Sequence, residues 1–127
     1  MKNRMTVLIR VTFGLLMVSA PLYGHHAMSL FDQKRVVSVT GKVTEFVWAN
    51  PHATMEMDVA DQKGNADKWL IEFGPPAQLK RDNGLGPDSF RPGDTVTIAG
   101  HPYKDGRKIM RPTKIVLANG KEVANLY

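Results

Sequence analysis

Side chains that could form a soft-metal site gather within residues 48–57. This stretch contains Trp48, His52, Met55 and Met57. Imidazole and thioether groups are ligands that copper accepts. Met55 and Met57 are two residues apart, so on a strand they lie on the same face. Methionine is also an adaptable core residue, and a place in the core is the alternative for this pair.

The N-terminal residues 1–24 have the pattern of a secretory signal peptide. Lys2, Arg4 and Arg10 form a basic region, and residues 11–20 form an apolar run that is too short for a membrane span. Cleavage after Gly24 is expected rather than after Ala20, because Pro21 would otherwise follow the cut bond. We therefore expect a periplasmic or secreted protein with no stable membrane anchor after cleavage.

Cleavage after Gly24 makes His25 the first residue of the mature chain, where two of its nitrogens could chelate one metal ion. A free α-amine has a pKa of roughly 7.7–8.0, so a metal can displace its proton. This arrangement resembles the histidine brace of copper monooxygenases and of some copper carriers. The predicted cofactor is therefore copper. The alternative is a terminus whose histidines bind metal only incidentally.

The candidate metal ligands come from three parts of the chain. His52 follows an Asn-Pro pair, and His101 lies in a Gly-His-Pro triplet at an expected strand end. Each of these two histidines has an alternative as an ordinary surface or structural residue. The full predicted set is His25, His26, His52, His101, Met55 and Met57.

Composition excludes several classes of function. Without the three basic residues of the signal, the chain has 14 basic and 12 acidic residues. This net positive charge is too small to indicate nucleic acid as a partner. The chain has no cysteine and therefore no disulfide. It also lacks a nucleophile elbow, a phosphate-binding loop and an HExxH motif, which argues against an enzyme.

Hydrophobic alternation predicts an all-β domain over residues 25–127. The first strand has Val37, Val39, Val43 and Val47 on one parity and is interrupted by Gly41, where a bend would let it serve two sheets. The order of elements is that of an OB-like barrel of five strands, with a short helix between strands 3 and 4. The expected strands are 35–49, 53–60, 68–74, 95–99 and 109–117, the helix is 77–82, and a tail follows at 123–127.

Motifs along the mature chain resemble a family of short exported bacterial proteins of uncharacterised function. They include His25-His26, the segment 39–46, Asn50-Pro51-His52, Pro92-Gly93-Asp94 and the segment 96–102. A looser likeness links His52, Met55, Met57 and a tryptophan to periplasmic OB-fold copper chaperones, although the order of the residues differs. The resemblance implies an exported small barrel and leaves its activity open.

Three functions remain open at this point. The first is a protein that binds or carries a transition metal, most simply copper. The second is a module that docks an exported protein partner or an oligosaccharide through the open face of the barrel. The third is a copper oxidase that uses the N-terminal histidine and needs an open coordination position.

Overall fold

A long, bent first strand organises the barrel. The computed structural model describes residues 28–127, and in it β1 runs over Val37–Val47. Residues 37–42 pair with β4 (Thr95–Pro102), and residues 42–47 pair with β2 (Thr54–Ala60). A side chain on Gly41 would meet the carbonyl oxygen of Asp58, so glycine is required where the strand passes between its partners. The predicted bend is confirmed.

A β-bulge changes which side of β1 faces the core. The register with β2 shifts between Val43 and Glu45, and the extra residue reverses the alternation beyond it. Val43 is buried, but Val47 is 40% exposed. Phe46 and Trp48 pack against the core instead. Val47, which shares a parity with the other three valines in the sequence, therefore does not share their side of the strand.

The second and third strands form a regular hairpin. β3 covers Ala66–Glu72 and is antiparallel to β2 along its whole length. Met55 and Met57 on β2 and Ile71 on β3 are fully buried, as their alternation predicts. Asp61 organises the turn, because one of its carboxylate oxygens accepts the backbone N–H of residues 63 and 65.

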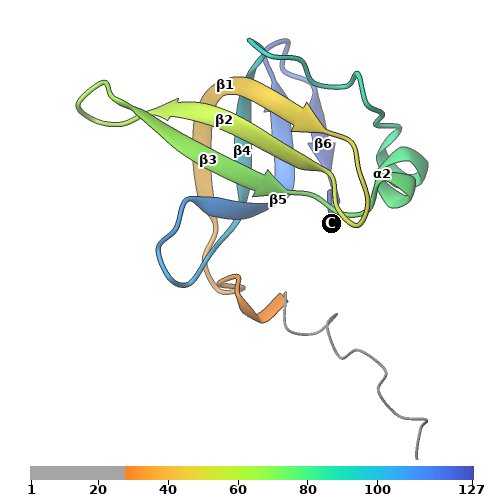
Figure 1. Ribbon diagram of the computed structural model, residues 1–127, viewed down its shortest axis with the longest axis horizontal. Helices are drawn as coiled ribbons and strands as arrows, with labels where there is room; N and C mark the ends of the chain where they lie inside the picture. Colours follow the sequence, from red (N-terminus) through yellow and green to blue (C-terminus); the bar gives the residue numbers. More distant parts are fainter. Residues whose placement is uncertain (1–27) are drawn as a thin grey trace, which may run out of the picture.

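The short helix α2 spans Pro76–Asn83, as expected between the third and fourth strands. Proline suits its first position because no backbone donor is needed there. Gly84 ends the helix with a φ of 67°, a left-handed conformation that glycine adopts without steric cost. Leu79 is fully buried. The helix lies beside the loop that joins β1 and β2 (Figure 1).

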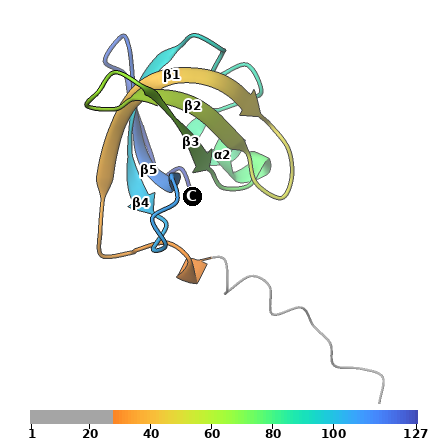
Figure 2. The same ribbon diagram turned by 60° about the vertical axis from the view of Figure 1, so that its left-hand side comes forward.

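Pairing between β3 and β5 closes the five-stranded barrel. β5 covers Ile109–Leu117, antiparallel to β4, and it meets β3 in parallel at two positions. Closure removes exposed strand edges, and Figure 2 shows the strands wrapped round one core. The register shift opposite Ala99 and Gly100 accommodates Pro112, which is buried. A three-residue strand, β6 (Glu122–Ala124), extends the sheet beyond β5 where we expected only a tail.

The chain before β1 pairs with the C-terminal end of β4 and the residues that follow it. Phe31 is fully buried and its ring meets Tyr103 edge-on, with centroids 4.7 Å apart. Backbone hydrogen bonds join Asp32 to Pro102 and Lys104 to Leu30. In both views this segment, shown in orange, lies beneath the barrel beside the loop between β4 and β5 (Figures 1 and 2). Within residues 28–127, no helix has the length and apolar character to span a bilayer.

Candidate metal centre

The first two predicted ligands, His25 and His26, lie outside the described residues, as does the expected signal peptide. The first described residue after them is Met28. Its sulfur accepts a hydrogen bond from Nη1 of Arg111 on β5. The chain is therefore in contact with the barrel two residues after His26.

His101 has a defined tautomer. Its Nδ1 lies 2.8 Å from the backbone carbonyl oxygen of Arg35. A carbonyl oxygen can only accept, so Nδ1 carries the proton and, in the neutral ring, Nε2 keeps its lone pair. In the part of the chain that the structure describes, no hydrogen bond occupies Nε2. His101 is opposite Arg111 in the pairing of β4 with β5.

His52 belongs to an aromatic and cationic stack at the C-terminal residue. Its ring is stacked on Tyr127, with centroids 5.8 Å apart and planes 18° apart. The guanidinium carbon of Arg111 lies 3.8 Å from the centroid of the same tyrosine ring. The Nε of Arg111 is buried and has no hydrogen-bond partner among residues 28–127. Arg111 thus touches both Met28 and the ring on which His52 stacks.

Met55 and Met57 are core residues in this fold. Both are 0% exposed and belong to the central cluster of apolar side chains. A metal ion could reach neither sulfur without opening the barrel, so the site proposed below does not use them. Trp48 and Trp69 also pack against this core. The large apolar area of these rings is the simplest reason for their positions.

Acidic residues do not add a ligand set. Glu45 and Glu56 are directly opposite each other on β1 and β2, and Lys68 lies 3.8 Å from the Glu56 carboxylate. Within the described residues, no three His, Asp or Glu side chains come together to hold a metal ion.

Burial, and then the negative charge of Glu72, raises the pKa of the Tyr103 phenol.

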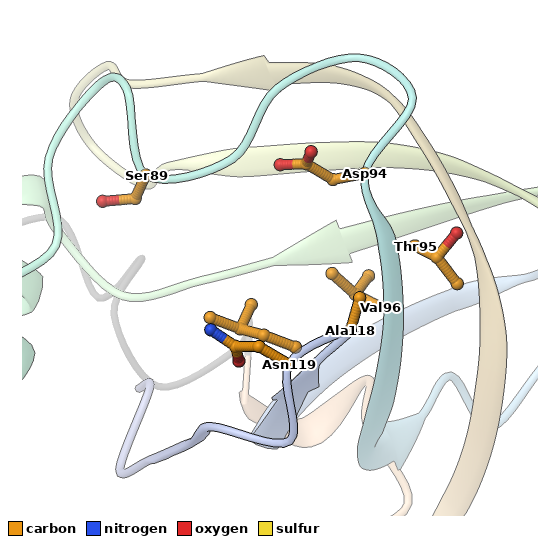
Figure 3. Close-up of a pocket in the computed structure, with 7 residues that line it drawn as sticks. Ser89, Asp94, Thr95, Val96, Ala118 and Asn119 are labelled. Atoms are coloured by element: carbon orange, nitrogen blue, oxygen red, sulfur yellow. The ribbon is translucent and has the colours of Figure 1, made fainter.

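A cavity of about 240 Å³ lies away from these histidines, between the loop before β4 and the turn after β5. Figure 3 shows Ser89 and Asp94 on one side and Asn119 on the other. The Asp94 carboxylate accepts the backbone N–H of Arg91 and so serves the local turn. Neither imidazole nor thioether lines this cavity, and no part of the predicted site falls there.

Sequence reasoning missed Met28, Arg111 and Tyr127. Met28 follows the two histidines closely, and this spacing was the available signal for a soft ligand beside them. Arg111 precedes a proline and Tyr127 is the last residue, and neither position has a pattern that predicts a contact with a histidine. Their juxtaposition depends on strand pairing and on the path of the C-terminal tail.

Together these features define a small closed OB-like barrel with one short helix, with imidazole, thioether and guanidinium groups near one end of β4 and β5. The chain belongs to a family of unknown function, DUF6152, whose model matches residues 13–110. The predicted membership of an uncharacterised family is confirmed. No curated protein matches the chain.

Several solved structures are similar to this chain at low identity. The mitochondrial single-stranded DNA-binding protein Rim1 of S. cerevisiae is 17% identical, with a TM-score of 0.44, over 66% of this chain and 94% of that one. A ZRD-deleted mutant of TiaS in complex with agmatine is 24% identical, with a TM-score of 0.44, and the match covers 76% of this chain and 25% of the TiaS chain. The yeast Stn1 and Ten1 structure is 17% identical, with a TM-score of 0.41, and the match covers 72% of this chain and 44% of the matched chain.

At these scores we draw nothing about ligand or activity from the solved structures. Our expectation that nucleic acid is not a partner stays a prediction. A mobility-shift assay with single-stranded DNA at low and at physiological salt tests it, because charge-driven binding weakens steeply as the salt concentration rises.

Proposed function

We propose that the protein is an exported barrel that binds a transition-metal ion, copper, at its mature N-terminus and at His101. The α-amine and ring of His25, together with His26, supply nitrogen ligands, and the barrel supplies the imidazole of His101. The observation that carries this proposal is the hydrogen bond from the Nδ1–H of His101 to the Arg35 carbonyl.

That hydrogen bond prepares His101 to be a ligand. Histidines that bind metals usually donate the other ring N–H to a carbonyl or carboxylate, which fixes the tautomer and the direction of the ring. The bond to Arg35 does this at 2.8 Å. The Nε2 lone pair is thus held in place before a metal arrives.

The path of the chain supports bringing the N-terminal histidines to this end of the barrel. Met28, the first described residue, follows His26 by two positions in the chain. Met28 contacts Arg111, and Arg111 is opposite His101. Directly opposed residues of an antiparallel pair have Cα atoms about 4.5–5.5 Å apart.

His52 is the second barrel histidine that we assign to this region. Its ring is held by Tyr127, which also contacts Arg111. Within residues 28–127, no hydrogen bond occupies the nitrogens of His52. We expect His52 to contribute less than His101, because no hydrogen bond fixes its tautomer.

The test is copper titration of the processed protein, residues 25–127, with the His101→Asn variant as the decisive comparison. An asparagine amide can donate to the Arg35 carbonyl in place of Nδ1–H, but it has no counterpart of Nε2. We expect His101→Asn to fold normally and to bind copper at least about tenfold more weakly. Asp88→Ala, at an exposed loop carboxylate, is the matched control and should bind as the original protein does.

Two results would overturn the proposal. One is unchanged copper affinity in a variant that has alanine at His25 and His26. The other is unchanged affinity in His101→Asn when N-terminal sequencing has established that His25 is the first residue. Localisation in the periplasm is part of the same proposal and is tested by cell fractionation.

A second candidate function rests on three cation–aromatic pairs near the loop between β4 and β5. Arg107 lies 4.9 Å from the Tyr103 ring centroid, and Lys108 lies 5.7 Å from that of Trp69. The third pair is Arg111 with Tyr127. Aromatic faces with polar neighbours suit the docking of an oligosaccharide or an exported protein partner. Ligand capture that survives replacement of the histidines but is lost in Tyr103→Ala would favour this function.

A further inference from the structure

One methionine differs from the others in the described chain by its exposure. Met55, Met57 and Met110 are 0% exposed, whereas Met28 is 36% exposed. Met28 is also close to the proposed nitrogen ligands in sequence, because it follows His26 by two residues. It is therefore the one thioether among residues 28–127 that a metal ion could reach without unfolding the barrel.

We infer that Met28 is a sulfur ligand of the proposed centre and that it makes the centre favour Cu(I). This inference rests on the proposed function and adds a ligand and an oxidation state to it. Thioether sulfur is a soft ligand that suits Cu(I) and contributes little to the binding of harder ions.

The contact with Arg111 places the sulfur. Nη1 of Arg111 is in contact with Sδ as a hydrogen-bond donor, and the guanidinium is itself held over the ring of Tyr127. A thioether sulfur has two lone pairs, so one stays available when the other accepts this hydrogen bond. Because Arg111 is opposite His101, sulfur and imidazole approach the same end of the sheet from β5 and β4.

The charge of Arg111 points to the same oxidation state. Arg111 stays protonated, and none of the ion pairs among residues 28–127 involves it. Coulomb repulsion scales with the charge of the incoming ion, so at equal distance the guanidinium opposes Cu²⁺ twice as strongly as Cu⁺. A soft ligand and a nearby fixed cation therefore both favour the monovalent ion.

The experiment compares Met28→Leu with Met110→Leu in the processed protein. Leucine keeps much of the volume and apolar character of methionine, so both variants should fold. Cu(I) affinity is measured under reductant against a coloured chelator, with Ag(I) as a probe that does not change oxidation state. Cu(II) affinity is measured separately without reductant.

We expect Met28→Leu to bind Cu(I) and Ag(I) at least about tenfold more weakly, with Cu(II) affinity changed by less than about twofold. Met110→Leu should change neither affinity. Unchanged Cu(I) affinity in Met28→Leu would overturn the inference and leave the nitrogen site intact. An equal loss for both oxidation states would also overturn it, because the side chain would then only position the terminus. If the original protein binds neither ion, the proposed function itself fails.

Discussion

Replacing Met57 with aspartate tests the central feature of the fold, the inward face of β2. Met57 is 0% exposed and is opposite Val43 on β1 and Trp69 on β3. Its methyl carbon lies close to Gly41, 3.0 Å from where a Cβ on that residue would stand. No polar side chain is buried in this core as a partner for a carboxyl group.

The expected cost of Met57→Asp has two parts. Truncating a buried methionine costs about 2–5 kcal/mol, from lost burial and the cavity that remains. Leaving a buried polar group without a hydrogen bond costs about 1–3 kcal/mol more. A domain of this size has a free energy of unfolding of about 5–15 kcal/mol. We therefore expect Met57→Asp to lose most of its stability or to fail to fold.

Urea unfolding followed by circular dichroism measures the effect. Met57→Leu keeps the volume and should cost less than about 1.5 kcal/mol. Val36→Asp places the same new charge at a position that is 60% exposed and should change stability by about 0.5 kcal/mol or less. A midpoint for Met57→Asp close to that of the original protein would refute the inward placement of this residue.

Three further predictions concern single positions. Gly41→Ala should destabilise the barrel by about 1–3 kcal/mol, because its methyl group would meet a carbonyl of β2, whereas Gly86→Ala has open space and should be tolerated; urea midpoints compare the two. Glu72→Gln should lower the pKa of the Tyr103 phenol, because the carboxylate disfavours the phenolate, and an ultraviolet titration that shows no change would contradict this. Hydrogen bonds from the turn N–H groups lower the pKa of Asp61. The carboxylate therefore adds to the stability of the fold above its unfolded-state pKa, and this stabilisation is lost as the pH falls through the folded-state pKa. Asp61→Ala should reduce stability at neutral pH but not at a pH below the folded-state pKa, and unfolding curves at the two pH values measure the difference.

Much of the fold follows from alternation and turn residues. The strand limits at Ile109 and Leu117, and the helix between two strands, are visible in the sequence because prolines and glycines mark their ends. The inward faces of β2 and of the first half of β1 follow from a period of two.

What alternation could not predict is a change of register. The bulge after Val43 depends on how β1 bends to meet both β2 and β4, so the sequence pattern placed Val47 on the wrong side. The short strand β6 was missed because three residues are too few to show a period. Both errors arise from pairing between segments that are distant in the chain.

The candidate site was predictable as a set of residue types but not as an arrangement. Histidines suggest metal binding wherever they occur, whereas the tautomer of His101 depends on a carbonyl 66 residues away in the chain. The same limit applies to the methionines. Sequence spacing places Met55 and Met57 on one face of a strand, where both are fully buried, whereas Met28 is 36% exposed.

The most direct test of the account is copper binding by the exported, correctly processed protein, compared with its His101→Asn variant. We predict that the mature chain begins at His25, that it binds one copper ion, and that His101→Asn weakens binding at least about tenfold while the urea midpoint stays the same. Equal copper affinity for both proteins, each beginning at His25, would contradict it.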